Sequence, residues 1–232
     1  MNSNYSRSLK IQNYFENINP IELRGDKNKY GIYNCVYHII KRVEIKDNHS
    51  YLYIGCGDGT ILNKIKQIIP NCKIDGLDFS KTLIDKAKTL NPSSEFYLQD
   101  VKSIKLNKKY DKIFSFSLLQ YLTIPEINKT NISLSKLFLK EKDSEIIHMS
   151  IPDVRLRNIS GYINLSKRRL SVLIPFFQLY KLFKSSYKFS NDGSLYHHPL
   201  DIEKSSYKIF KYEVLPSDSY YRFDIKMKNK II

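Results

Sequence analysis

Cysteine is scarce in this 232-residue chain, which contains only Cys35, Cys56 and Cys72. They form no C-x-x-C pair and have no His-rich companion spacing, so the sequence indicates neither a disulfide scaffold nor a zinc site. A reducing, cytoplasmic setting is the expectation that follows. Glycine and proline, eight of each, are too few for a collagen-like or linker-dominated chain. With 42% hydrophobic and 26% charged residues, the composition predicts one large globular domain or two small ones.

Long apolar runs are also missing. No stretch approaches the ~18 apolar residues that span a bilayer, and the first residues lack the apolar core of a signal peptide. We therefore expect neither secretion nor a transmembrane segment. Acidic residues are outnumbered, with 23 Asp and Glu against 38 Lys and Arg, a net charge of +15. This balance favours an anionic partner such as nucleic acid, a phosphorylated metabolite or an acidic membrane surface, although scattered lysines equally fit a solvated surface without a polyanion.

The hydrophobic pattern divides the chain at about residue 50. Residues 1–50 are predicted to form an N-terminal helical arm, with helical patterns at Leu9–Phe15 and Tyr33–Val43. From residue 51 to about 151, short apolar runs alternate with amphipathic ones, which predicts a parallel sheet flanked by helices. The predicted strands are Tyr51–Ile54, Lys73–Leu77, Glu95–Leu98, Lys112–Ser117 and Glu145–Ile151, and the predicted helices are Thr60–Ile69, Lys81–Leu90 and Pro125–Lys140.

The alternation of strand and helix patterns ends after the fifth predicted strand. Residues 153–198 are expected to form an insertion that covers one end of the sheet. Within it, Lys167–Lys184 is basic and apolar; we favour a lid over the acceptor, with contact to anionic lipid or a dimer face as alternatives. Two strand-like runs, Tyr207–Leu215 and Tyr220–Met227, then flank a turn. The predicted fold class is α/β, with a mostly parallel seven-stranded sheet, flanking helices and a C-terminal antiparallel hairpin, all within a domain of residues 51–232.

A glycine-rich turn carries the strongest chemical signal. The strand Tyr51–Ile54 leads directly into Gly55-Cys56-Gly57-Asp58-Gly59 and then into a predicted helix. Glycines in such a turn let backbone N–H groups approach a ligand closely, because no side chain obstructs them. The dinucleotide fingerprint would need glycine at Thr60, and the P-loop sequence G-K-[ST] is absent. A nucleoside site without these phosphate motifs is favoured, with a tight loop of an unrelated α/β fold as the alternative.

Two acidic residues follow the next two predicted strands. Asp78 lies about 20 residues beyond the glycine turn, the spacing at which a carboxylate meets a ribose diol. Asp100 follows the strand Glu95–Leu98, and its oxygens could accept from an adenine amino group. Because open α/β sheets bind ligands at the carboxyl ends of their strands, both carboxylates are expected at one crevice. For Asp100 alone, a helix cap or a solvated acid is an equal alternative.

These segments resemble the class I S-adenosylmethionine-dependent methyltransferases. Tyr51–Gly59 is similar to their first motif, Gly76–Ser80 to the ribose-binding second strand, Gln99–Val101 to the adenine-binding segment, and Tyr110–Leu122 to the fourth-strand signature. The resemblance covers about residues 51–151 and implies S-adenosyl-L-methionine as the cofactor. The cofactor-binding residues that it implies are Gly55, Cys56, Gly57, Asp78, Phe79, Asp100, Val101, Ser117 and Gln120.

Other positions bear on catalysis. Tyr53 stands where the family commonly has an acidic residue, which implies that the amino group of the cofactor is held differently. His148 lies inside a predicted strand and is expected to be buried or sheet-facing. His197 and His198 lie in a region that contributes to the acceptor pocket of similar enzymes. With the ordinary histidine pKa of about 6.5, either could take a proton from the acceptor. The alternative is that both lie in a surface turn.

The resemblance implies a small, free-standing bacterial methyltransferase (EC 2.1.1.-) that needs no metal. We expect O- or N-methylation of a small anionic acceptor, because similar enzymes often modify sugars or phosphorylated groups in surface-polysaccharide or capsule biosynthesis. The segment Ser115–Leu118 differs from the Asn/Asp-Pro-Pro-aromatic loop of nucleobase-modifying relatives. Two alternatives stay open. One is an RNA methyltransferase, suggested by the +15 charge, and the other is a non-catalytic binding subunit, which Tyr53 permits.

Overall fold

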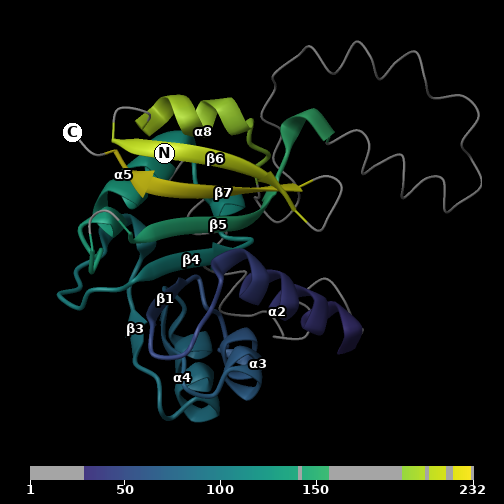
Figure 1. Cartoon of the computed structure of the whole chain (residues 1–232), viewed down its shortest axis with the longest axis vertical. Coiled ribbons are helices and arrows are strands. Elements are labelled where there is room, and N and C mark those ends of the chain that lie inside the picture. Colours follow the sequence, from purple (N-terminus) through teal and green to yellow (C-terminus); the bar gives the residue numbers. More distant parts are fainter. Residues whose placement is uncertain (1–28, 141–142, 157–194, 207–208, 218–221, 231–232) are drawn as a thin grey trace, which may run out of the picture.

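The computed structural model describes residues 29–140, 143–156, 195–206, 209–217 and 222–230, which are coloured in Figure 1. The strands are β1 (Ser50–Ile54), β2 (Lys73–Asp78), β3 (Phe96–Leu98), β4 (Lys112–Phe116), β5 (Glu145–Pro152), β6 (Phe210–Pro216) and β7 (Arg222–Asn229). The α-helices are α2 (Lys29–Val43), α3 (Thr60–Ile68), α4 (Lys81–Leu90), α5 (Ile124–Ser135) and α8 (Pro199–Ser206). Short 3-10 helices are η2 (Val101–Ser103), η3 (Leu119–Tyr121) and η4 (Val154–Leu156).

The described strands form one seven-stranded sheet in the order β3-β2-β1-β4-β5-β7-β6 (Figure 1). Strands β1 to β5 run parallel to one another, and β7 is antiparallel to both β5 and β6. The predicted fold class is therefore confirmed, including the closing antiparallel hairpin. Since the parallel strands all end at the same edge, the loops that follow β1, β2, β3, β4 and β5 come together there.

Helices cover both faces of the sheet. Alternate residues of a strand point to opposite faces, and β1 illustrates this. Leu52 and Ile54 pack in a core with residues of α5 and α8, whereas Tyr51 and Tyr53 pack with residues of α2, α3 and α4. Every residue of β5 is buried, as expected for a central strand with helices on both sides.

One predicted helix is too long. The pattern predicts a helix over Pro125–Lys140, but α5 ends at Ser135. Beyond that point the chain pairs with Tyr110, whose N–H donates to Leu137 O at 2.8 Å and whose carbonyl oxygen accepts from Leu139 N at 2.9 Å. Apolar residues continue at helical spacing past Ser135, so the spacing cannot reveal that their burial comes from this pairing.

Two predicted segments fall largely outside the described residues. The arm of residues 1–50 is described only from Lys29, where α2 begins, and this helix packs on the sheet through Val36, Ile39 and Val43. The helical pattern at Leu9–Phe15 and residues 157–194 of the predicted insertion lie outside. The domain division therefore stays a prediction. Among the helices that the structure describes, none is both long and apolar enough to cross a membrane.

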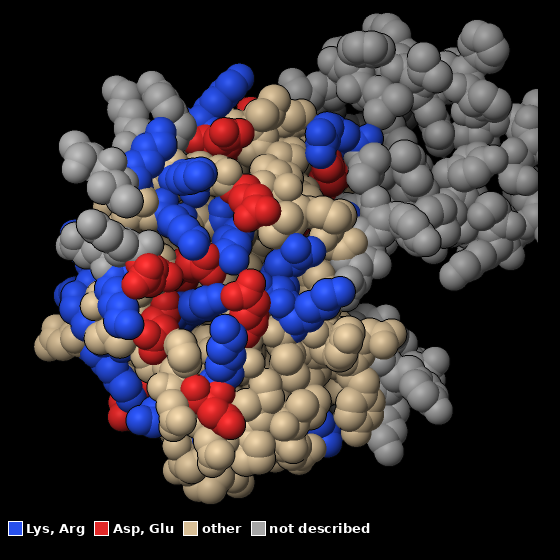
Figure 2. Space-filling view, in the orientation of Figure 1, with Lys and Arg blue, Asp and Glu red and all other residues tan. Residues whose placement is uncertain are grey.

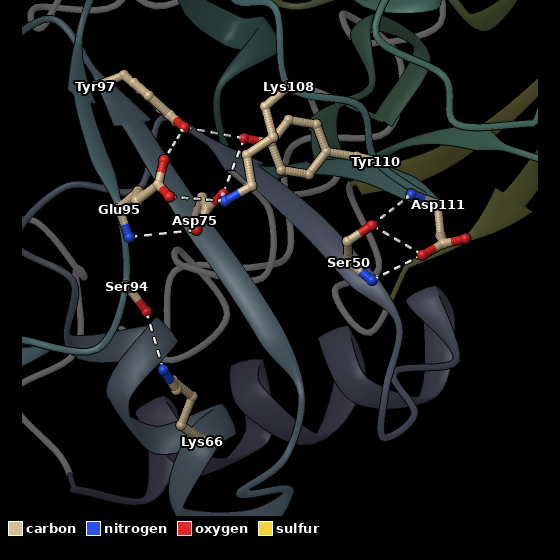
Figure 3. A network of polar contacts seen from close by, with 9 residues as sticks. All are labelled: Ser50, Lys66, Asp75, Ser94, Glu95, Tyr97, Lys108, Tyr110 and Asp111. Carbon is tan, nitrogen blue, oxygen red and sulfur yellow. Dashed lines mark hydrogen bonds and ion pairs between the residues drawn. The ribbon is translucent and has the colours of Figure 1, made fainter.

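A polar network joins the strands near their amino ends (Figure 3). The hydroxyl of Tyr110 donates to Asp75 Oδ2 of β2 at 2.9 Å, and Lys108 Nζ lies 2.7 Å from the same oxygen. Lys108 also pairs with Glu95, ahead of β3, at 3.1 Å. Burial raises the pKa of Tyr110 well above its ordinary value, so its hydroxyl remains a donor. This network lies at the edge opposite the carboxyl ends and stabilises the scaffold.

His148 of β5 belongs to a second, fully buried chain of contacts. Its Nδ1 lies 2.7 Å from Ser115 Oγ of β4, and its Nε2 lies 2.9 Å from Asn131 Oδ1 of α5. The carboxamide oxygen accepts, so Nε2 carries the proton and Nδ1 accepts from the serine hydroxyl. Burial lowers the pKa of His148 from 6.5 to about 3, which keeps the ring neutral. The ring links β4, β5 and α5, in agreement with the buried position predicted for it.

This burial makes stability depend on pH. The unfolded chain binds a proton at His148 below pH 6.5, and the folded chain binds it only near pH 3. The contribution is fully present above pH 6.5 and is lost as the pH falls towards 3, by up to about 1.4 kcal/mol per pH unit. Urea unfolding of His148→Gln should therefore show a shallower acid slope than the unchanged chain. The control is His49→Gln, at an exposed histidine; an unchanged slope in His148→Gln would refute the assignment.

Candidate functional site

The glycine turn lies at the carboxyl end of β1. Gly55, Gly57 and Gly59 all have left-handed backbone angles, with φ of 69°, 58° and 74°. The N–H groups of Gly55 and Cys56 donate to Leu77 O of β2 at 2.7 and 3.1 Å, which anchors the turn to the neighbouring strand. A Cβ placed on Gly57 would meet no atom within 4 Å. The turn is therefore fixed at its base and open at Gly57.

Asp78 joins this turn to the end of β2. Its side chain is buried, Oδ2 accepts from Gly57 N at 2.9 Å, and Oδ1 accepts from Ser80 N at 3.0 Å. Ser80 in turn caps α4 by accepting from Leu83 N. The carboxylate thus places negative charge beside the open part of the glycine turn. Phe79, the next residue of the predicted set, is half-buried.

Asp100 follows the neighbouring strand at the same edge, since Asp78 pairs with Leu98 and Gln99 N donates to Asp78 O at 3.0 Å. Its carboxylate accepts from Lys102 N at 2.9 Å and lies 3.3 Å from Lys102 Nζ. Asp100 is the N-cap of η2, and its side chain is 45% exposed. Val101 is buried beside it. The capping role considered for Asp100 is therefore present, and its contact with adenine stays a prediction.

The segment after β4 closes over the turn. Ser117 has a φ of 55°, and its N–H donates to Met149 O of β5 at 3.0 Å. A Cβ on Gly55 would lie 3.1 Å from Leu118 Cδ1, so Leu118 packs against the turn. The side chain of Gln120 is directed to the β5 side instead, where its Oε1 accepts from Arg222 Nη1 of β7 at 3.1 Å. Ser117 and Gln120 thus lie on the side of the turn away from β2.

The two candidate histidines differ sharply. His197 is fully buried, and its Nε2 donates to Leu119 O at 2.9 Å, which ties the chain before α8 to η3. His198 is half-buried, and its Nδ1 accepts from Leu200 N at 3.2 Å. The His197 ring thus serves as a structural link, while the contact of the His198 ring lies within its own turn. The catalytic assignment of either residue stays a prediction.

Tyr53, the departure from the family pattern, is buried and stacks on Phe114 with ring centroids 4.7 Å apart. Burial raises the pKa of Tyr53 well above its ordinary value, so its hydroxyl carries no negative charge. Tyr53 therefore cannot supply the charge of the acidic residue it replaces. Burial likewise raises the pKa of the Cys56 thiol, which disfavours a nucleophilic role.

A cluster around Asp224 of β7 was not predicted. This carboxylate is completely buried and accepts from three groups: His38 Nε2 at 2.8 Å, Arg42 Nε at 2.9 Å and Ser150 N at 2.9 Å. Ser150 has a φ of 60° and lies in an irregularity of the β5–β7 pairing between His148 and Ile151. The only signal in the sequence was an acidic residue inside an apolar strand pattern, and its partners on α2 are more than 180 residues away.

We expect Gly59 to tolerate no side chain. A Cβ there would lie 2.7 Å from Asn91 Nδ2 and 2.9 Å from Ala87 Cβ, on a backbone with φ +74°. Left-handed strain and overpacking together should lower the free energy of unfolding of Gly59→Ala by about 2–5 kcal/mol. Gly57→Ala is the matched control, because it adds similar strain but no overlap. Equal losses of the two variants in urea unfolding would contradict the packing argument.

Parts of this chain are similar in sequence to known methyltransferases. Residues 52–137 match a family described as a methyltransferase domain. A malonyl-[acyl-carrier protein] O-methyltransferase of Ilyobacter polytropus is 34% identical over 107 residues, which are 43% of this chain and 40% of that protein. The match covers less than half the length of this protein and of other curated relatives.

Solved structures match over nearly the whole chain. The magnesium protoporphyrin IX methyltransferase of Synechocystis PCC 6803, with bound S-adenosylmethionine, has a TM-score of 0.60 and 14% identity, covering 99% of this chain and 100% of that chain. An amino pentose methyltransferase of Micromonospora echinaspora has a TM-score of 0.57 and 9% identity, covering 86% and 90%. At these identities the likeness shows a shared fold.

Proposed function

We propose that this chain, which has the class I methyltransferase fold and matches a methyltransferase-domain family over residues 52–137, transfers a methyl group from S-adenosylmethionine to a small-molecule acceptor. The observation that carries the proposal is the contact between the carboxylate of Asp78 and Gly57 N at 2.9 Å. It brings a buried acid to an open glycine turn at the carboxyl edge, the combination suited to the ribose of a nucleoside.

The residues at this edge fit the cofactor. Gly57 offers open space for a close approach, and Asp78 offers carboxylate oxygens to a ribose diol. When bound, S-adenosylmethionine supplies the methyl group as an electrophilic sulfonium. Asp100 would accept from the adenine amino group after its carboxylate turns away from Lys102. The proposed cofactor-binding set is Gly55, Cys56, Gly57, Asp78, Phe79, Asp100, Val101, Ser117 and Gln120.

We assign the general base to His198. Its ring would take the proton that the acceptor oxygen or nitrogen loses as that atom is methylated, while bound S-adenosylmethionine would supply the methyl group and leave as the neutral thioether. Because Nδ1 of His198 accepts from Leu200 N, the neutral ring carries its proton on Nε2. Nδ1 is therefore the atom that receives the proton, and it must exchange its 3.2 Å contact with Leu200 N for one with the acceptor.

His198→Ala should lower kcat by about 100-fold or more and leave the affinity for S-adenosylmethionine unchanged, because general bases typically contribute that factor. The comparison is His197→Ala, which removes a buried contact to Leu119 O and should lower stability. Single-turnover rates and urea unfolding distinguish the two. A His198→Ala variant with the full rate would exclude this base.

The acceptor is proposed to be a small anionic molecule that is O- or N-methylated, such as a sugar or phosphorylated group of a bacterial surface polysaccharide or capsule. Two observations support this class. The solved amino pentose methyltransferase, which shares the fold, supports a sugar, and the net charge of +15 supports an anionic group. Residues 157–194 contribute seven Lys and Arg against one Asp, a net +6 of that total.

An RNA acceptor is the second candidate, favoured by the same net charge. Figure 2 shows Lys and Arg interleaved with Asp and Glu on one face. On the described residues, Lys112, Lys226 and Lys228 all lie within 3.1 Å of the buried carboxylate of Glu145. Lys112 and Lys226 also pair with Glu44 at 3.2 and 3.8 Å, so two carboxylates offset two of these three positive charges. We therefore rank RNA second. Binding to a generic transcript should weaken steeply with salt if this candidate holds, because binding releases counterions.

Titration calorimetry with S-adenosylmethionine tests the proposed function. Binding is expected, and its absence would favour the non-catalytic subunit that Tyr53 permits. Incubation with a labelled methyl donor and an extract divided into metabolites, polymers and lipids then identifies the acceptor class. Label in the small-molecule fraction supports the proposal, while label in RNA would replace it with the second candidate.

A further inference from the structure

Arg222 is the first residue of β7, an antiparallel strand among parallel ones. Its register partner is Pro152, the last residue of β5. The beginning of β7 therefore lies at the edge where β4 and β5 end, the edge that carries the glycine turn (Figure 1). The strand order therefore places the positive charge of Arg222 at the same edge as the candidate site. In the sequence, Arg222 lies far from the glycine turn, near the C-terminal end.

The guanidinium is held in a defined orientation. Its Nη1 donates to Ser150 O at 2.6 Å and to Gln120 Oε1 at 3.1 Å. Ser150 is itself fixed, because its N–H donates to the buried Asp224 at 2.9 Å and its φ of 60° turns the strand at this point. Gln120 is buried in η3. A backbone carbonyl and the carboxamide of a buried glutamine thus orient a half-buried arginine side chain.

The same short helix holds the segment before α8, which carries the proposed base. The carbonyl oxygen of Gln120 accepts from Leu195 N at 2.6 Å, and that of Leu119 accepts from His197 Nε2 at 2.9 Å. Residues 195–198 therefore run beside η3 on the side of β5, and Arg222 contacts η3 through Gln120. Arg222 and His198 share one support, on the side of the glycine turn away from the ribose-binding acid.

We propose that Arg222, oriented by Gln120 and Ser150 O, is the acceptor-binding residue of this site and recognises an anionic group, phosphate or carboxylate, on the methyl acceptor. This inference rests on the proposed function and deepens it by naming the recognition element. A planar guanidinium matches the paired oxygens of both groups and binds them with charge-assisted hydrogen bonds. Binding the anion at Arg222 would bring the acceptor to the side of the site where His198 lies.

The experiment uses the full chain saturated with S-adenosylhomocysteine and follows arginine Nε–Hε signals by NMR. One titration uses inorganic phosphate and the other acetate, so the arms distinguish the two anions. We expect a saturable shift of the Arg222 signal, and a loss of affinity of about tenfold or more in Arg222→Gln. Arg155→Gln is the matched control at the same edge, because Arg155 pairs with Asp153 at 2.6 Å, and its affinity should stay within about twofold.

Equal anion affinity in Arg222→Gln and the unchanged chain would overturn the proposal, as would no response of the Arg222 signal to either anion. If Arg222→Gln unfolds, Arg222→Lys serves instead; it keeps the charge but loses the paired donors, so unchanged affinity again overturns the proposal. Calorimetry with S-adenosylmethionine is run on the same preparations. No cofactor binding refutes the proposed function, whereas cofactor binding without anion binding at Arg222 refutes only this inference.

Discussion

Asp78→Ala is expected to weaken S-adenosylmethionine binding by at least about 100-fold. The carboxylate holds Gly57 N at 2.9 Å and Ser80 N at 3.0 Å, and it is the proposed ribose acceptor. Hydrogen bonds to a charged group contribute about 1.5–3 kcal/mol each, and about 1.4 kcal/mol changes affinity tenfold. Losing the ribose contact and the shape of the turn together therefore accounts for the expected factor. Titration calorimetry measures it directly.

Two matched variants make this result specific. Asp85→Ala removes an exposed acid of α4 that pairs with Lys81 four residues earlier, so cofactor affinity should not change. Asp78→Asn keeps the size of the side chain and should fall between the unchanged chain and Asp78→Ala. Thermal unfolding of each variant separates a lost ligand contact from a lost fold. Cofactor affinity within about threefold in Asp78→Ala would refute the proposed site.

Asp224→Ala should lower the free energy of unfolding by about 3–5 kcal/mol, the range for removing one partner of a buried ion pair. Asp224 is completely buried and is the acceptor for His38, Arg42 and Ser150 N. Its loss leaves the Arg42 guanidinium without this counter-ion and removes the hydrogen bond that supports the left-handed Ser150. Helix α2 would also lose its polar attachment to β7.

Urea unfolding monitors this loss, with Glu213→Ala as the control because Glu213 is an exposed acid on the neighbouring β6. Asp224→Asn should be intermediate, since the amide oxygen can still accept either from Ser150 N or from both His38 and Arg42. A decrease below about 1 kcal/mol in Asp224→Ala would show that the cluster is not a stabilising element. Because Ser150 O contacts Arg222, the variant should also change the response of Arg222 to anions.

Much of the scaffold could be predicted from local patterns. The helix Lys81–Leu90 has the predicted bounds, and α3 and β5 each differ from the prediction by one residue. These segments combine clear periodicity with strong end signals, such as Ser80 as a cap and Pro152 at the end of β5. Where the periodicity continued past the end of an element, as after Ser135, the prediction was wrong, because burial there comes from a distant partner, Tyr110.

Some residues of the candidate site could also be predicted from local patterns, and others could not. The glycine turn and Asp78 could be identified from spacing, because the turn and its strand are contiguous and the acid follows the adjacent strand. The contact of Gln120 with Arg222 joins residues 102 positions apart, and that of His38 with Asp224 joins residues 186 apart. Neither pair has a spacing that a periodic pattern can encode.

The sequence by itself determined the alternation of strands and helices, the glycine turn and the acid that faces it, since each depends on neighbouring residues and on the twofold or 3.6-fold repeat of the backbone. Only the tertiary structure decided which polar groups meet. The antiparallel insertion of β7 beside β5 brings Arg222 and Asp224 to β5, while the fold turns His197 inward to Leu119 O. These contacts depend on strand order and register, which arise when the whole chain packs and not from any one segment.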